Sequence, residues 1–140
     1  MLYEWDSSLE SGYPKVDNQH KQLISALNNL VEASRAGKGD EAVLQTMDFL
    51  VGYTVKHFAD EENLQKKYEY PDYLGHKRIH DDFKESVLKT VQRVKQEGPS
   101  EALVAEVCAS LGAWIVNHIR GDDFRMATYV KAMDKSLPAV

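Results

Sequence analysis

The sequence has 140 residues, a length that fits one domain able to bury a hydrophobic core without disulfides. Its hydrophobic share of 43% and charged share of 28% are ordinary for a globular protein, and a net charge of −5 without a basic run argues against nucleic acid as a partner. The single cysteine, Cys108, excludes an internal disulfide framework and fits a reducing compartment.

The N-terminal stretch MLYEWDSSLE has neither the basic nor the apolar region of a signal peptide. No apolar stretch approaches the ~20 residues that span a bilayer. We therefore expect a cytoplasmic protein with no membrane partner.

Helix-favouring residues dominate the chain, and glycines and prolines separate four long segments in which apolar residues recur every three or four positions. After an extended arm over residues 1–17, the spacing predicts helices over about 18–36, 40–67, 72–97 and 99–119, and a short helix over about 122–136. We expect Gly37 to end the first helix in the left-handed conformation and Asp40 to cap the second. Because short loops between long amphipathic helices favour antiparallel neighbours, we predict a single all-α domain, an up-down-up-down antiparallel four-helix bundle.

All five histidines lie on the predicted inward faces of these helices. They occupy the four helix ends that an up-down-up-down bundle brings together: His20, His57, His76, His80 and His118. Counted from the opposite end of each helix, one histidine per helix lies at a common depth of roughly 26 Å. The sequence therefore predicts a polar layer inside an apolar bundle.

Two pairs in this layer, His57/Glu61 and His76/His80, have the i,i+4 spacing that presents two ligands on one helix face. A single inward histidine is more often a hydrogen-bonded core residue, but five in one layer with Glu61 favour a metal site. With an aspartate from position 122 or 123, the layer offers seven donors. That number is too large for one tetrahedral zinc and suits two ions bridged by carboxylates.

Four stretches of the chain resemble the signature stretches of hemerythrin: VDNQH at 16–20, HFADEE at 57–62, HKRIH at 76–80 and WIVNHIRGDD at 114–123. The stretch YEWD at 3–6 is similar to the bacterial branch of that family, and the resemblance covers residues 3–129. It implies a non-haem di-iron centre that binds O₂ reversibly as a peroxide-level adduct.

The resemblance also implies roles for individual residues. One iron would be held by His76, His80 and His118, and the other by His20 and His57, with Glu61, Asp123 and an oxo or hydroxo group as bridges. The iron with two histidines would keep an open position for O₂, lined by Trp114, Ile115 and Ile119.

The choice of aspartate is open on spacing alone. Ideal helix geometry from His118 favours Asp122 at i+4, because the side chain at i+5 points about 140° away. The family pattern favours Asp123, and Gly121 between them is able to loosen the helix.

We predict an O₂-binding protein for storage, delivery or sensing, and not an enzyme. The alternatives are a di-iron peroxidase, oxidase or nitric-oxide-handling enzyme on the same scaffold, and a module that holds iron or zinc without O₂ chemistry. No protein partner is indicated. Asp17 and Gln19 either orient His20 or cap the first helix, and Cys108 is expected to be a small buried hydrophobic residue.

Overall fold

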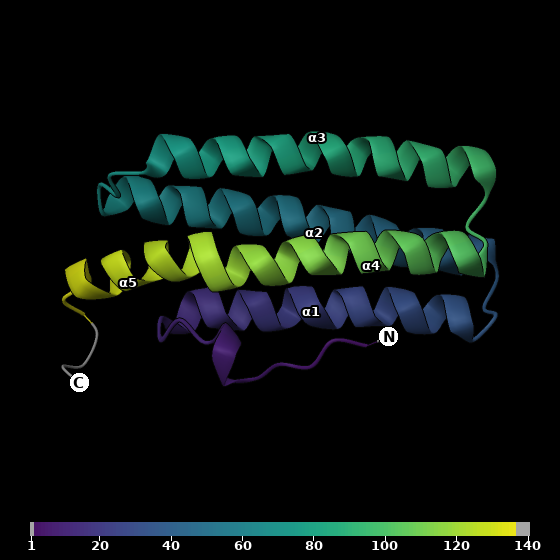
Figure 1. Cartoon of the computed structure of the whole chain (residues 1–140), viewed down its shortest axis with the longest axis horizontal. Coiled ribbons are helices and arrows are strands. Elements are labelled where there is room, and N and C mark those ends of the chain that lie inside the picture. Colours follow the sequence, from purple (N-terminus) through teal and green to yellow (C-terminus); the bar gives the residue numbers. More distant parts are fainter. Residues whose placement is uncertain (1, 137–140) are drawn as a thin grey trace.

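The computed structural model describes residues 2–136; residue 1 of the predicted arm and residues 137–140 of the predicted domain lie outside that range. Four long helices alternate in direction: α1 (Pro14–Arg35), α2 (Asp40–Lys67), α3 (Tyr73–Glu97) and α4 (Glu101–His118) (Figure 1). Around the bundle, α1 contacts α2 and α4, and both of these contact α3. The predicted all-α four-helix bundle is confirmed.

The apolar faces of the helices form two separate clusters of buried residues. The larger cluster runs along most of the bundle and includes Leu27, Leu50 and Val107. The smaller one closes the other end and consists of Tyr13, Val16, Leu64, Met126, Ala127 and Val130. The histidines lie between these clusters along the helices, so apolar packing shields the polar layer from both ends.

Helix α1 begins at Pro14, four residues earlier than predicted, and the arm is correspondingly shorter. Proline is well suited to the first helical position because its fixed φ is helical and that position needs no N–H donor. The carboxylate of Asp17 accepts hydrogen bonds from the backbone N–H groups of Ser11 and Gly12 and from the Ser11 hydroxyl. Asp17 therefore anchors the chain that enters the helix, and its carboxylate makes no hydrogen bond to His20 among the described residues.

Glycine or serine residues stand at three other helix ends. Gly37 has a φ of 65°, as predicted for a left-handed helix end. The residue before α2 is Gly39, with a φ of 94°, so Asp40 is the first helical residue and makes no side-chain cap; its expected capping role was wrong. Its negative charge still lies at the positive end of the helix dipole. At α4, the Ser100 hydroxyl accepts from the N–H of Leu103 and places the helix start at residue 101 rather than 99.

The C-terminal part differs from the prediction in its boundaries. Helix α4 continues into η2, a π-helical turn over Ile119–Asp123, and then into α5 (Phe124–Met133) on the same axis (Figure 1). The last helix therefore begins and ends inside the predicted range of 122–136. It stops at Asp134, whose backbone is extended and whose carboxylate accepts a hydrogen bond from the Tyr13 hydroxyl.

One helical stretch, Glu101–Met133, is long and apolar enough by composition to cross a membrane. The expectation that no stretch approaches that length is corrected accordingly. Half of its most apolar window is buried inside the bundle, and we assign it to the core.

Candidate metal centre

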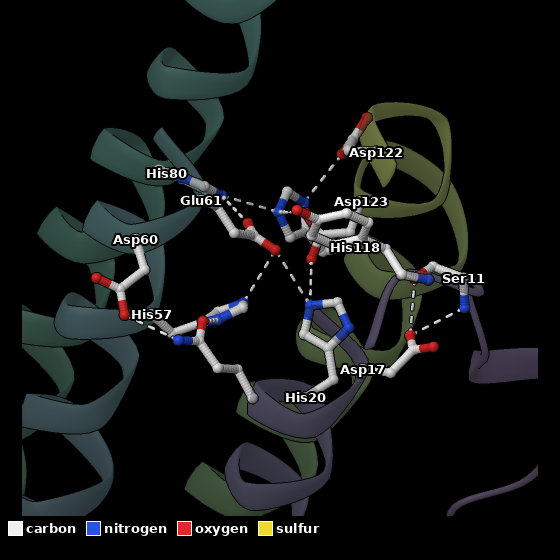
Figure 2. A network of polar contacts seen from close by, with 12 residues as sticks. Ser11, Asp17, His20, His57, Asp60, Glu61, His80, His118, Asp122 and Asp123 are labelled. Atoms are coloured by element: carbon white, nitrogen blue, oxygen red, sulfur yellow. Dashed lines mark hydrogen bonds and ion pairs between the residues drawn. The ribbon is translucent and has the colours of Figure 1, made fainter. Parts of the chain in front are cut away.

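The seven residues predicted as ligands lie in one buried cluster. All of them except His76 are labelled in Figure 2. They come from the facing ends of the four long helices and from the π-helical turn: His20, His57, Glu61, His76, His80, His118 and Asp123. Their donor atoms form two groups, each with all atoms within 4.8 Å of one another. One group holds His76, His80 and His118, the other holds His20 and His57, and both include Glu61 and Asp123.

Glu61 divides its two carboxylate oxygens between the groups. Its Oε2 lies 3.1 Å from Nε2 of His57 and 3.2 Å from Nε2 of His20. Its Oε1 lies 3.3 Å from Nε2 of His80 and 3.6 Å from Nε2 of His76. One carboxylate therefore faces both sets of imidazoles, which is the arrangement of a bridging ligand.

Asp123 divides its oxygens in the same way. Its Oδ2 lies 2.9 Å from Nε2 of His20, whereas its Oδ1 lies 2.9 Å from Nε2 of His76 and 3.0 Å from Nε2 of His118. Asp122 stays outside the cluster, with its Oδ2 3.0 Å from Nδ1 of His118. The exposed fraction of the side chain is 1% for Asp123 and 27% for Asp122.

The π-helical turn explains why the later aspartate is the inner one. In an α-helix the side chain at i+4 follows the face of residue i, but a π-helical turn is wider by one residue. The turn over Ile119–Asp123 therefore brings Asp123, at i+5, onto the face of His118. Helix periodicity by itself pointed to Asp122, and the resemblance pointed to the residue that the structure buries.

Several donor atoms of the cluster are buried and, although oppositely charged groups lie close to them, make no hydrogen bond of acceptable geometry. They are Nε2 of His57, Nε2 of His76, Oε1 of Glu61 and both carboxylate oxygens of Asp123. Buried polar atoms without partners are costly, and such atoms at functional sites point to a missing ion or water. Imidazole nitrogens and carboxylate oxygens that converge in this way fit two divalent cations.

The electrostatics of the cluster point the same way. Burial by itself lowers the pKa of His20, but the carboxylates of Asp123 and Glu61 outweigh burial and raise it to about 10. The same balance raises the pKa of His76 to about 9. Burial raises the pKa of Glu61, yet His57 and the other imidazoles hold it well below the ordinary value. Both carboxylates are thus anions that attract positive charge, which protons supply in the metal-free chain.

Three residues support the imidazoles from outside the cluster, and of these only Gln19 was considered for such a role from the sequence, as a partner of His20. Glu62 accepts a hydrogen bond from Nδ1 of His80 at 2.9 Å. Gln19 hydrogen-bonds to His57 rather than His20: its Oε1 accepts from Nδ1 of His57 at 2.7 Å, and its Nε2 donates to Asp60 at 2.8 Å. Each of these residues is adjacent in the sequence to a predicted ligand, which is only a weak signal for such contacts.

Aromatic rings cover one side of the cluster. Phe58, which sequence reasoning did not single out, stacks on His80 with ring centroids 3.9 Å apart. Trp114 stacks on His118 at 4.5 Å and on Phe83 at 3.6 Å. Ile115 and Ile119, also predicted to line the O₂ position, are buried with 3% of their surface exposed. These side chains exclude water from the imidazoles.

A family model described as "Hemerythrin HHE cation binding domain" matches residues 11–130, which include all seven clustered residues. The chain belongs to the hemerythrin family. A bacteriohemerythrin of Stenotrophomonas maltophilia is 36% identical over 131 residues, which cover 94% of this chain and 83% of the relative. A myohemerythrin of Theromyzon tessulatum is 33% identical over 123 residues, 88% of this chain and 89% of the relative.

The fold is shared with solved hemerythrin structures. The crystal structure of a hemerythrin point mutant matches with a TM-score of 0.77 at 25% identity, over 92% of this chain and 97% of that chain. Hemerythrin is thus indicated by the family model, by curated relatives and by the arrangement of the helices in space.

Proposed function

We propose that this hemerythrin binds O₂ reversibly at a pair of iron ions and serves in O₂ storage, delivery or sensing. The observation that carries the proposal is the division of both buried carboxylates, Glu61 and Asp123, between two sets of imidazoles. Membership of the hemerythrin family selects iron among the divalent ions that such donors accept. When bound, two ferrous ions supply the two electrons that reversible O₂ binding needs.

In the proposed assignment, His76, His80 and His118 hold one iron, and His20 and His57 hold the other. Glu61 and Asp123, with an oxo or hydroxo group, bridge the ions. The grouping follows the two sets of donor atoms that lie within 4.8 Å of one another. The set with two imidazoles has one protein ligand fewer, so it is the half proposed to keep a position open for O₂.

The surrounding residues are proposed to keep the O₂ position dry. Trp114, Ile115 and Ile119 are assigned to its lining, and Phe58 to the cover over the imidazoles. Support comes from the burial of Ile115 and Ile119 and from the stacking of Phe58 and Trp114 on two of the histidines. Exclusion of water and protons would slow autoxidation of the irons and so favours reversibility.

The test is a cycle of gas exchange on the iron-loaded protein. Ferrous protein prepared under argon is exposed to O₂ and then flushed, while the visible spectrum and the iron content are recorded. We expect two irons per chain and an absorption band that appears with O₂ and disappears under argon. A band that never forms, or forms once and does not reverse, contradicts reversible binding. Turnover of peroxide in the presence of a reductant at a rate higher than that of autoxidation would favour the enzymatic alternative.

A further inference from the structure

The nitrogens of the histidines that face away from the cluster have unequal partners. Nδ1 of His80 donates to a Glu62 carboxylate oxygen at 2.9 Å, and Nδ1 of His118 donates to an Asp122 carboxylate oxygen at 3.0 Å. Nδ1 of His57 donates instead to the neutral amide oxygen of Gln19 at 2.7 Å. Nδ1 of His20 is buried and has no hydrogen-bond partner among the described residues.

The orientation of the Gln19 amide is decided by its second contact. The end of the Gln19 amide that faces away from His57 lies 2.8 Å from a carboxylate oxygen of Asp60. The same oxygen accepts a hydrogen bond from the Lys56 ammonium group at 2.9 Å. Because a carboxylate only accepts, the Gln19 nitrogen must face Asp60 and the Gln19 oxygen must face His57. Nδ1 of His57 therefore carries a proton, which leaves Nε2 as the nitrogen able to bind a metal ion.

These contacts divide along the two groups of donor atoms. The group with three imidazoles has two that donate to carboxylates, whereas the group of His20 and His57 has none. A carboxylate behind an imidazole raises its basicity and fixes its ring, so it strengthens the bond to a metal; loss of such a partner typically weakens metal affinity by about 10- to 100-fold. A neutral amide orients the ring but adds little basicity.

We propose that Gln19 and Glu62 are positioning residues that make the two metal positions unequal, so that the ion held by His20 and His57 is released first. This inference rests on the proposed two-iron site and deepens it. It makes the half that is open to O₂ also the half that exchanges its metal, while His76, His80 and His118 retain theirs.

The decisive variant exchanges an amide and a carboxylate without changing the net charge. In the double variant Gln19→Glu with Asp60→Asn, a carboxylate accepts from His57 and the new amide donates to that carboxylate. Asp60→Asn alone is the matched control, since it removes the same charge from position 60 and leaves the Gln19 amide behind His57. Glu62→Gln makes the opposite change at His80, from carboxylate to amide.

The experiment follows iron release. Each protein is loaded with ferrous iron under argon and mixed with an excess of a colorimetric ferrous chelator, and absorbance is recorded with time. We expect two phases of one ion each in the unmodified protein. The double variant should slow the first phase about 10-fold and leave the second unchanged, and Glu62→Gln should speed the second phase about 10-fold. Asp60→Asn alone should change either phase less than about 2-fold.

Several results would overturn the proposal. These are two ions released at one rate, an effect of the double variant on the slow phase, or an equal effect of Asp60→Asn alone. Thermal unfolding of the metal-free variants separates positioning from general destabilisation. If the residues act by positioning, the rates of iron release should change without a matching change in melting temperature. Fewer than two irons per chain in the unmodified protein would instead refute the proposed function itself.

Discussion

Gln65 is a buried side chain whose replacement should stabilise the protein. It lies in α2 one turn after Glu61, none of its surface is exposed, and neither its amide nitrogen nor its amide oxygen has a hydrogen-bond partner among the described residues. Burying an unpaired amide costs about 1–3 kcal/mol in proteins, and replacing it by an apolar group of the same shape removes that cost. Gln65→Met keeps the length of the side chain.

We therefore expect Gln65→Met to raise the free energy of unfolding of the metal-free protein by about 1–3 kcal/mol, which corresponds to a rise in melting temperature of roughly 3–10 °C at this chain length. The assay is urea and thermal unfolding by circular dichroism in the presence of a chelator. Gln45→Met, on the exposed face of the same helix, is the matched control and should change stability by less than about 0.5 kcal/mol. A loss of stability in Gln65→Met would mean that the amide is hydrogen-bonded in solution, and the reasoning would fail.

Three further predictions test other parts of the structure. Asp123→Asn should leave fewer than two irons per chain after desalting, whereas Asp122→Asn should retain two and release the ion at His118 about 10-fold faster, as Glu62→Gln does; loss of an iron from both variants would contradict the proposed bridging role of Asp123. Burial raises the pKa of the Cys108 thiol from 9.0 to about 11, so the thiol ionises first in the unfolded chain and stability is lost as the pH rises between these values. By about pH 10.5 the free energy of unfolding, measured by urea titration, should fall by about 2 kcal/mol more in the unmodified protein than in Cys108→Ala. Identical pH profiles of the two proteins would contradict this prediction. A Cβ at Gly112 would overlap the Tyr3 ring, so Gly112→Ala should displace the arm and speed its cleavage by protease, while α4 gains about 0.5–1 kcal/mol of helix propensity.

Much of the fold could be predicted because helix formation and burial leave a local pattern. Leu23, Leu27 and Leu30 recur at helical spacing, and all three are buried in α1. The same periodicity assigned every histidine to an inward face, and all five are buried. The common depth of the histidines followed from counting residues at a fixed rise per residue, since an antiparallel bundle aligns alternate helix ends.

Errors arose where two local signals compete. Pro14 was placed inside the arm over residues 1–17, although proline is well suited to begin a helix, and helix α1 starts at that residue. Asp40 is a good capping residue by type, but Gly39 adopts the positive φ that places it outside the helix and Asp40 inside. The path of the chain between two packed helices decides which residue begins the helix, and the spacing of apolar residues carries no information on that path.

The choice between Asp122 and Asp123 shows the limit of periodicity most clearly. Periodicity assumes one residue count per turn, and the π-helical turn at Ile119–Asp123 breaks that assumption at the site itself. The resemblance to hemerythrin named the buried aspartate without supplying this reason.

The sequence by itself determined which helices form, which faces they bury and which six of the seven side chains share a layer, because each of these follows from local spacing. Only the tertiary structure decided which atoms meet across helices. The pairing of Gln19 with His57 joins residues 38 positions apart, and that of Glu61 with His20 joins residues 41 apart. Such contacts depend on how each helix is rotated about its axis and shifted along it. A shift of one residue rotates the helix face by about 100° and would replace every partner.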